Sequence, residues 1–468
     1  MIGFYRYFSR GCVGLVVIFT LVSCVAQLPA PDVEFPDSYI YNDGKGMAVD
    51  TLSQSQDWWL MYNDSVLDSL EKVALQNNRN IAVAASRIES ARYALAVARA
   101  AFLPSLNAEL SAEGSYKTPL GDSYEIVLQP AVSWSVSLFG ALRHTTREMR
   151  AEIFSSEWAH RGVMLSLTQQ VAQAYFTMRW YRQSLDIARR SYRLRQTSVA
   201  LIDSLVYYGM STSLDSEQAK SLAYTAAADI EQYDRALKQA SLSMAVLLGQ
   251  PPQSLKEIAL AELDMASLPA EVPAGVPSDL FGRRPDIMES YYELQAAAAK
   301  VGVARSNRFP SVALTGSGGL FGGNVKQLFK DGYWSWGATA SVAQPLFAFG
   351  RLKRAEQIAR ENYNQAALEY EQTVLQALED VESALVSMAT YRSQIVAYVD
   401  YVAANGRIAE MTEALYRLGQ NNYLDVITTR QTWYESQLAL VQLIAQQYIN
   451  YSTLVMALGD DWTDIVEP

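Results

Sequence analysis

The chain has 468 residues, of which 50% are hydrophobic and 19% are charged, and its formal net charge is −11. By length alone, two or three domains are expected. The charged fraction lies below the ~25% that is usual for soluble domains, so an unusual share of side chains avoids bulk water. The acidic balance argues against nucleic-acid binding, which needs a basic surface. Two His and two Cys are too few for an ordinary metal site or a disulfide scaffold.

Residues 1–24 predict export from the cytoplasm. Arg6 and Arg10 precede an apolar run, Gly11 to Val22, which is too short to be a permanent membrane helix. The run ends in Leu21-Val22-Ser23-Cys24, which resembles the bacterial lipobox, so we expect a covalent lipid on Cys24 and no other cofactor or metal. The alternative is a plain signal peptide with an incidental cysteine. No Asp follows Cys24 directly, which favours the outer membrane as the destination.

Two groups of residues in the chain recur in the same order. Ala98-Arg99-x3-Leu103-Pro104-Ser105 returns as Ala304-Arg305-x3-Phe309-Pro310-Ser311, and Gly209-x4-Leu214-Asp215 returns as Gly419-x4-Leu424-Asp425. We therefore expect one structural unit used twice. The predicted divisions are a signal peptide at 1–23, an extended N-terminal arm at 24–57, a first repeat at 58–250, a linker at 251–277, a second repeat at 278–460 and a C-terminal tail at 461–468.

Each repeat is predicted to run helix, strand pair, helix, helix. No proline occurs from Ala131 to Gln250 or from Leu346 to Glu467, which permits very long helices. We expect helices from Ala141 to Tyr208 and from Arg351 to Leu418, each ~100 Å long. In the second of these helices, apolar and aromatic residues at heptad spacing predict coiled-coil packing. They are Ala377, Val381, Ala384, Met388, Tyr391, Ile395, Tyr398 and Val402.

The segments between the helices alternate with the period of a β-strand. Leu106 to Glu113, Ile126 to Leu138, Val312 to Thr315 and Trp334 to Val342 each place apolar residues on one face and polar or small residues on the other. A glycine-rich loop is expected at Gly316 to Gly323. The alternation suits a barrel with lipid outside and water inside, and it suits two soluble hairpins with one buried face equally well. The export signal favours the barrel.

The number of strands predicts an oligomer. Four strands cannot close a barrel, and an open sheet edge is not tolerated in hydrocarbon. Two copies would give eight strands and a lumen filled by side chains, whereas three copies would give twelve and leave room for passage. We therefore expect a homotrimer in contact with outer-membrane lipid. Its interfacial aromatic belt is predicted at Trp134, Tyr333, Trp334 and Trp336.

Motifs along the whole mature chain resemble those of TolC-type outer-membrane efflux factors, in particular the lipidated branch of drug-efflux outer-membrane lipoproteins. They are Trp58-Trp59, Asp64-x2-Leu67, Ala74-Leu75-x2-Asn78, the two Ala-Arg entries into the strands, Arg283-Arg284-Pro285-Asp286-Ile287 and Gln344-Pro345-Leu346-Phe347-x2-Gly350-Arg351-Leu352. The resemblance implies a mostly α fold with a transmembrane β part, in which a TolC-like trimeric α-barrel continues a shared 12-stranded β-barrel. Two internal structural repeats build it.

The resemblance also implies a function. The protein would be the outer-membrane exit duct of a tripartite efflux system, lipid-anchored and with a long periplasmic extension. The duct would passively conduct substrates delivered by an inner-membrane efflux pump and a periplasmic adaptor protein. No catalysis is implied.

Gly209 and Gly419 interrupt the two long proline-free segments, and polar residues follow each of them, as a turn between helices requires. Each glycine therefore marks the tip of a helix hairpin. The resemblance implies that these tips contact the adaptor and close the duct. The alternative is that both are ordinary hairpin turns.

The resemblance further implies gate residues at the tips. Leu424 matches the apolar gate position and Asp425 matches a lumen-facing acid, while Tyr416 and Asp215 match a tyrosine–aspartate bond that ties the two tips together. Three symmetry copies of Asp425 near one axis would favour cations. The alternative for Leu424 and Asp425 is simple tip packing.

Two positions depart from the family pattern at the tips. Asn421 stands where a locking arginine is found, and Thr428 stands where a second acid is usual. The contacts that hold the tips closed are then weaker, or Arg417 replaces the missing arginine.

Two other classes of function compete with the duct. One is a non-conducting periplasmic coiled-coil lipoprotein scaffold with soluble hairpins. The other is a carboxylate hydrolase, for which Glu379-Asp380 and Glu382 are the available acids. These acids lie on the heptad helix, where a solvated or lumen-lining face is the simpler interpretation.

Overall fold

The computed structural model describes residues 31, 35–41, 57–117, 121–254, 258–265, 268, 277–330 and 333–459. The predicted signal peptide and Cys24 lie outside these residues. The chain divides into two compact units, and each is described by itself. Unit 1 contains Met1–Val33, Ala85–Trp158 and Met288–Thr373, and unit 2 contains Glu34–Ala84, Ala159–Ile287 and Val374–Pro468.

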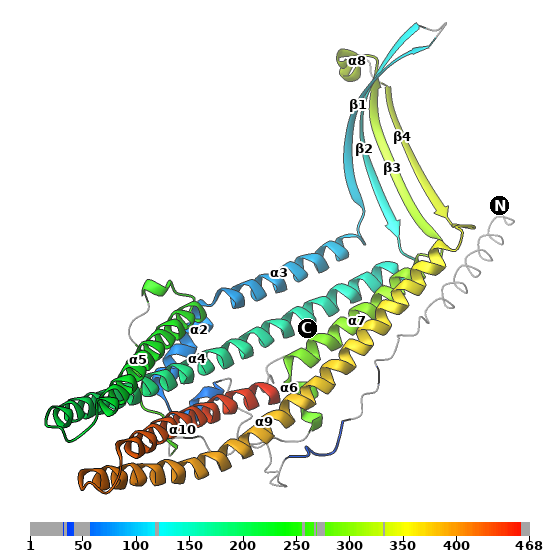
Figure 1. Ribbon diagram of the computed structural model, residues 1–468. Coiled ribbons are helices and arrows are strands. Elements are labelled where there is room, and N and C mark those ends of the chain that lie inside the picture. The colour runs from blue at the N-terminus through cyan, green and yellow to red at the C-terminus, as the bar shows by residue number, and fades with distance from the viewer. Residues whose placement is uncertain are drawn as a thin grey trace. The chain divides into compact units, whose positions relative to one another are not determined.

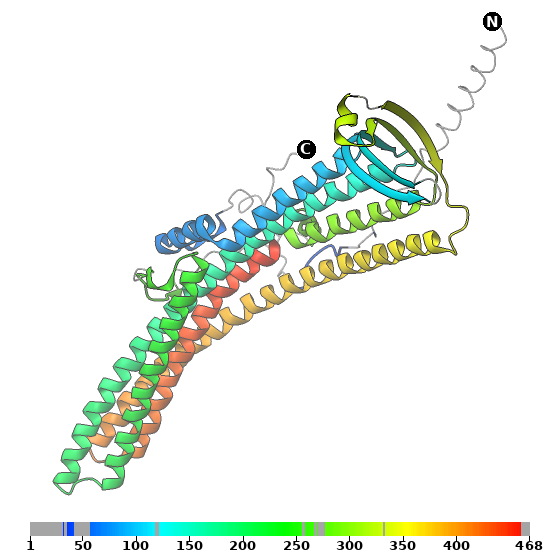
Figure 2. The ribbon, with the colours of Figure 1, turned by 90° about the horizontal axis from the view of Figure 1, so that it is seen from above.

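The elements follow the predicted order twice (Figures 1 and 2). The first half contains η2 (Trp58–Tyr62), α2 (Ser65–Asn77), α3 (Arg79–Ala100), β1 (Ser105–Lys117), β2 (Gly121–Val136), α4 (Ala141–Tyr207) and α5 (Ser213–Leu247). The second half contains η5 (Pro277–Asp279), α6 (Leu280–Arg283), α7 (Pro285–Ser306), β3 (Ser311–Gly322), α8 (Val325–Lys330), β4 (Tyr333–Ala343), α9 (Arg351–Arg417) and α10 (Tyr423–Leu458). A short turn, η3 (Pro252–Ser254), follows α5.

The two long helices are confirmed, because α4 and α9 begin at the predicted residues and each ends one residue early. Four of the predicted heptad residues on α9, Ala377, Val381, Ala384 and Ile395, are almost completely buried. The heptad spacing therefore identified the packing face of this helix. Among the described residues, no helix combines the length and the hydropathy that a membrane span needs.

Unit 1 carries one antiparallel sheet in the order β1-β2-β3-β4 (Figure 1). The register places Leu110, Leu128, Leu320 and Trp334 in one row across the four strands. Because side chains alternate between the two faces of a strand, the even-numbered residues share this face. Its other large members are Leu106, Tyr116, Tyr124, Ile126, Val132, Trp134, Val136, Val312, Leu314, Trp336 and Val342.

The opposite face of the sheet is mainly polar or small. Ser133, Thr315 and Thr339 form one row, and Glu109 lies opposite Gln129 in another. A third row, next to the connection between β3 and β4, interrupts this face with apolar and aromatic side chains. It contains Ser111, Val127, Phe321 and Tyr333.

The glycine-rich segment expected as a loop is part of β3, so that prediction is wrong. Gly316 to Phe321 pair with β4, which places Gly318 directly opposite Trp336, and Gly322 pairs with Ile126 of β2. A Cβ at Gly319 would lie 2.7 Å from the carbonyl oxygen of Leu128. The glycines here allow the neighbouring strands and the ring of Trp336 to approach β3 closely. Close approach of another backbone or a large side chain is a common reason for glycine within a strand.

The helices of unit 1 pack through aromatic rings and ion pairs. Phe154 of α4 stacks on Tyr292 of α7 with ring centroids 4.9 Å apart. Lys300 of α7 lies 3.5 Å from Glu152 of α4. Gly302 makes room for the His144 ring, because a Cβ at this glycine would overlap the imidazole.

The core of unit 2 explains the motif residues near the start of the mature chain. Trp59 is 1% exposed, and the ring of Tyr62 lies 4.7 Å from that of Phe176. Asp64 caps α2 by accepting the backbone N–H groups of Val66 and Leu67. The other carboxylate oxygen of Asp64 accepts from Arg179 at 3.1 Å, so one acid both begins a helix and pairs a buried guanidinium.

Equivalent contacts close both repeats of unit 2. Asn78 donates to the carbonyl of Leu247 at 2.8 Å, at the end of α5. Arg284 donates to the carbonyl of Ala457 at 2.9 Å, at the end of α10. These side chains bind helix carbonyls that have no partner within the helix. Asn78 and Arg284 therefore cap equivalent helix ends in the two repeats, although they are different residue types.

Candidate functional site

The predicted tips are two helix-hairpin turns of the same geometry in unit 2, and they lie side by side (Figures 1 and 2). Gly209 has φ +71° and Gly419 has φ +72°. After each glycine, a backbone N–H returns to a carbonyl five residues earlier, from Met210 to Leu205 and from Gln420 to Leu415, both about 2.8–2.9 Å long. Only a residue that tolerates the left-handed region ends a helix in this way.

The helices that leave the two tips are capped differently. Thr212 and Asp215 form a capping box at the start of α5. At the matching place in α10, Asn422 accepts the backbone N–H of Asp425 at 2.9 Å. The carboxylate of Asp215 is therefore used within its own cap, whereas that of Asp425 accepts no hydrogen bond from the described residues.

Tyr416 and Asp215 lie close together, but the described tips contain no direct hydrogen bond between them. Within the described tips, the Asp215 carboxylate accepts from the hydroxyl of Ser211 at 2.9 Å and from that of Thr212 at 2.7 Å. Beyond the effect of burial, Ser211 lowers and the Asp215 charge raises the pKa of Tyr416, so the phenol lies beside this cap. The carboxylate that Tyr416 was expected to bind is therefore engaged by Ser211 and Thr212 within the cap.

The charges of this cluster are fixed near neutral pH. The hydroxyl and the amide of Thr212, together with Ser211, hold the pKa of Asp215 below its ordinary value against the opposing effect of burial. Burial raises the pKa of Tyr416. The tip therefore contains an ionised carboxylate and a neutral phenol.

Apolar packing joins the two hairpins behind the tips. Ile202 of α4, Ala219 of α5 and the α10 residues Tyr423 and Val426 form one buried cluster. Tyr416 packs against it, with its ring centroid 5.5 Å from that of Tyr423. Tyr416 therefore packs against the core and lies beside the polar cap of α5.

The positions that depart from the family pattern have local partners. Asn421 accepts the backbone N–H of Asn422, and Thr428 donates to the carbonyl of Leu424. Arg417 pairs with Glu413 at 2.6 Å, and Glu413 also binds Arg430. Burial alone would raise the pKa of Glu413, but the hydrogen bonds and charges of the two arginines lower it.

The apolar and acidic gate candidates occupy the first turn of α10. Leu424 is 54% exposed, although it is a large apolar side chain at a helix start. Asp425 is half-buried. Neither side chain is fully buried within the single chain, so both can contact another copy of the chain in an oligomer.

The predicted aromatic belt is divided between the two faces of the sheet in unit 1. Trp134, Trp334 and Trp336 share the apolar face, whereas Tyr333 lies on the other face, so its place in the belt is corrected. Adjacent residues of a strand point in opposite directions, which a run of aromatics in the sequence conceals. The indole of Trp134 donates to the carbonyl of Phe102 at 2.8 Å.

The acids that a hydrolase would need serve structural contacts in unit 2. Asp380 accepts from the buried guanidinium of Arg284 at 3.0 Å. Glu382 accepts the backbone N–H groups of Ile40 and Tyr41 at 2.6 and 3.2 Å. Glu382 therefore holds the described part of the N-terminal arm rather than facing solvent alone.

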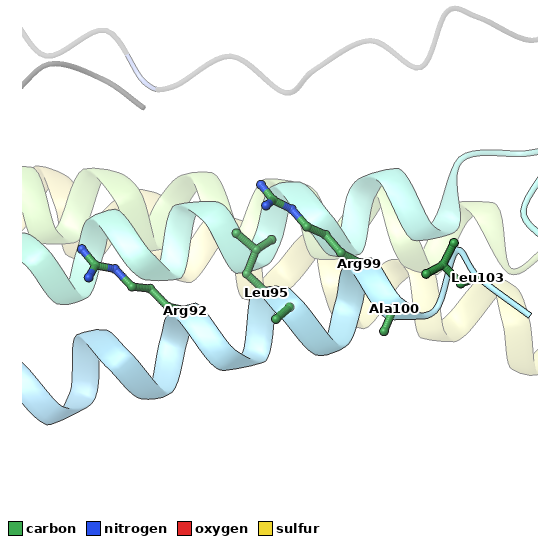
Figure 3. Close-up of a pocket in the computed structure, with 6 residues that line it drawn as sticks. Arg92, Leu95, Arg99, Ala100 and Leu103 are labelled. Carbon is green, nitrogen blue, oxygen red and sulfur yellow. The ribbon is translucent and has the colours of Figure 1, made fainter. Parts of the chain in front are cut away.

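The described residues offer little support for a small-molecule or metal site elsewhere. An open hollow of about 490 Å³ is lined by Arg92, Leu95, Ala96, Arg99, Ala100 and Leu103. Figure 3 labels five of these residues, all but Ala96. All six residues come from α3 and the turn after it, so the hollow has a single wall. No group of three or more His, Cys, Asp or Glu side chains in the described residues is arranged to hold a metal ion.

This arrangement of a four-stranded sheet and two long helix hairpins is the fold of TolC-like outer-membrane channels. A solved structure of CusC, named a cation efflux system protein in Escherichia coli, matches it with a TM-score of 0.80 and 28% sequence identity. The match covers 92% of this chain and 99% of that one.

The chain belongs to the outer membrane efflux protein family, whose model matches residues 70–250 and 276–460. It is 29% identical over 463 residues to the antibiotic efflux pump outer membrane protein ArpC of Pseudomonas putida, covering 96% of this chain and 94% of ArpC. It is 27% identical over 464 residues to the probable outer membrane lipoprotein SilC of Salmonella typhimurium, covering 98% and 100%. The protein is therefore an outer-membrane exit duct of an efflux system, and its family is one of transport channels.

Proposed function

We propose that the duct is a homotrimer that conducts passively, and the sheet carries this proposal. β1 and β4 are edge strands of a sheet with one apolar and one mainly polar face. Unpaired edges and an exposed apolar face are unfavourable in one chain, and pairing β4 of one copy with β1 of the next removes both problems in a membrane. Three copies pool twelve strands and leave a lumen behind the polar face.

We propose that the tips at Gly209 and Gly419 are the docking points for a periplasmic adaptor, which links the duct to an inner-membrane efflux pump. In the trimer, the exposed Leu424 side chains and the Asp425 carboxylates form the apolar and acidic rings of a periplasmic gate. In this proposal, Tyr416, Ser211 and Asp215 form a bridge that holds the two hairpins of each chain together. The charge of Asp425 makes cations the favoured ions at this constriction.

The gate is tested with the double variant Tyr416→Phe and Asp215→Ala in planar lipid bilayers. Removing the phenol hydroxyl and the carboxylate breaks the bridge, so single-channel conductance is expected to rise severalfold over the wild-type trimer. Thr429→Ser, which lies on the same helix as the gate but outside the bridge, is the control. Unchanged conductance in a correctly assembled trimer would remove this cluster from the gate, and absence of any conductance would refute the duct.

We also propose that Cys24 carries the lipid anchor. The lipobox-like ending of the export signal supports this, as does the name of SilC, which is a probable outer membrane lipoprotein. A Cys24→Ala variant is expected to lose metabolic labelling by palmitate. Retained labelling would place the lipid elsewhere.

A further inference from the structure

One buried guanidinium connects three of the four helices behind the tips. Arg195 of α4 is 9% exposed and donates to the carbonyl of Leu222 in α5 at 2.8 Å. It also donates to the side-chain oxygen of Gln431 in α10 at 2.5 Å and to the hydroxyl of Ser191 at 3.1 Å. Its guanidinium carbon lies 5.4 Å from the ring centroid of Tyr434. Arg195 therefore crosses from the α4–α5 hairpin to the α9–α10 hairpin.

A second contact crosses in the opposite direction beside the first. Tyr434 of α10 donates its hydroxyl to the carboxylate of Asp229 in α5 at 3.0 Å. Gln431 donates its amide nitrogen to Glu435 at 2.5 Å, which leaves the amide oxygen turned toward Arg195. We name Arg195, Gln431, Tyr434 and Asp229 the inter-hairpin link.

The chemistry of this link requires an arginine. A guanidinium offers several donors in a fixed plane and stacks on an aromatic ring, whereas an ammonium is a compact point charge. Here the three directions of donation are set by a hydroxyl, a main-chain carbonyl and an amide oxygen, with the ring of Tyr434 against the guanidinium. Moving α10 relative to α4 would strip the cation of its acceptor and its ring together.

The link occurs in only one of the two repeats. The residue equivalent to Arg195 in the second repeat, at the offset of the two tip glycines, is Asn405. Asn405 is buried, and its side-chain nitrogen has no hydrogen-bond partner in the described residues. Tyr224, the equivalent of Tyr434, is 72% exposed. The link is therefore not a packing feature that both hairpins share.

We propose that Arg195 is a positioning residue of the periplasmic gate, which holds the α9–α10 hairpin against the α4–α5 hairpin through Gln431 and Tyr434. This inference rests on the proposed gate at the tips. Arg195 lies 14 residues before Gly209, so the link acts about 20 Å from the tip along α4. The bridge at the tip and the link behind it then resist separation of the hairpins at two levels.

The test measures single-channel conductance of the full-length trimer in planar bilayers. Arg195→Lys keeps the charge but loses the planar fork, and Gln431→Met removes the acceptor with little change in volume. Each variant is expected to raise conductance severalfold, and the double variant is expected to match the single ones because both break one link. Arg193→Lys, an exposed position two residues away, is the matched control and is expected to conduct like the wild type.

Three results would overturn the inference. Wild-type conductance in Gln431→Met and Arg195→Lys, with a lowered midpoint of thermal unfolding, would make the link a packing contact only. Opening by the Tyr416 and Asp215 variants without opening by these two would leave the proposed gate standing and refute the role of Arg195. Absence of conductance in every variant would refute the gate and this inference together.

Discussion

Glu71, in α2, buries a carboxyl group completely, and neither of its oxygens has a hydrogen-bond partner among the described residues. Burial, with a smaller repulsion from Asp68, raises the pKa of Glu71 from 4.5 to about 10. The folded protein therefore keeps this acid protonated at neutral pH, whereas the unfolded chain releases the proton. An isolated charge here would be very unfavourable, which is why the group remains neutral.

The sign of the pH dependence follows from this shift. Because the unfolded chain binds fewer protons than the folded one above pH 4.5, the free energy of unfolding falls as pH rises toward 10. Glu71→Gln removes the penalty, and it is expected to raise the stability by about 3 kcal/mol at pH 7 and to change it little at pH 4. Chemical denaturation at several pH values measures the difference.

Glu410→Gln, an exposed position on α9, is the control for Glu71→Gln. It is expected to leave the pH dependence as it is in the wild type. If the stability curves of Glu71→Gln and the wild type run parallel between pH 4 and pH 9, the side chain of Glu71 is ionised in the fold.

At the scale of the elements, two glycines end long helices in the same conformation but in different surroundings. Gly209 ends α4 with φ +71°, and a Cβ added to it would meet no other atom within 4 Å. Gly249 follows α5 with φ +66°, and a Cβ added to it would overlap the carbonyl of Asn77. Gly209 is needed only for its left-handed backbone conformation. Gly249 also makes room for the end of α2.

This difference predicts unequal effects of alanine at the two positions. Gly209→Ala is expected to lower the free energy of unfolding by about 1 kcal/mol, the strain of a left-handed alanine. Gly249→Ala adds overpacking against Asn77 and is expected to lower it by about 3 kcal/mol. Thermal unfolding followed by circular dichroism compares them, and equal losses would show that the close approach at Gly249 is unimportant.

At the scale of the whole molecule, the two-faced sheet requires partners. Leu110 is 69% exposed and shares a row with Leu128, Leu320 and Trp334. Trp134 pairs with Leu314 and Trp334 pairs with Leu320. Those two rows are about 20 Å apart along β3, close to the ~25 Å height of the apolar band of a membrane barrel.

Arginine substitutions at two neighbouring positions of β1 test which face of the sheet contacts lipid. Leu110→Arg places a charge on the apolar face, with an expected cost of about 2–4 kcal/mol per chain in lipid, so the yield of trimer in the outer membrane is expected to fall sharply. Glu109→Arg, on the polar face, is expected to assemble. Trimer is measured as the heat-sensitive oligomer band in outer-membrane fractions, and equal yields of both variants would contradict lipid contact of this face.

The regular elements were predictable because their signals are local. Proline-free stretches and heptad spacing located α4 and α9, and Gly209 and Gly419 marked their ends, since each signal acts within a few turns of helix. Tyr416 and Asp215 were placed in one cluster by family resemblance. The hydrogen bond from Ser211 to Asp215 was not predicted, because a serine in a turn has no distinctive sequence signal.

The predictions that failed depended on neighbours distant in the sequence. Gly316 to Gly322 have the composition of a loop, yet pairing with β2 and β4 makes them a strand. Tyr333 was grouped with Trp334 because the two are adjacent, although the pleat sends them to opposite faces. The contact between Arg195 and Gln431 was not predicted at all, because the two residues are 236 positions apart and no local sequence pattern relates them.

The sequence by itself determined the repeated unit, the long hairpins and the alternation of the strands, because each is a periodicity or a backbone preference carried by neighbouring residues. Only the tertiary structure decided the register of the four strands, the use of Asp215 within its own cap and the link from Arg195 to α10. These depend on which surfaces meet when distant segments pack. That choice is set by the combined shape and charge of both partners, which neither segment carries alone.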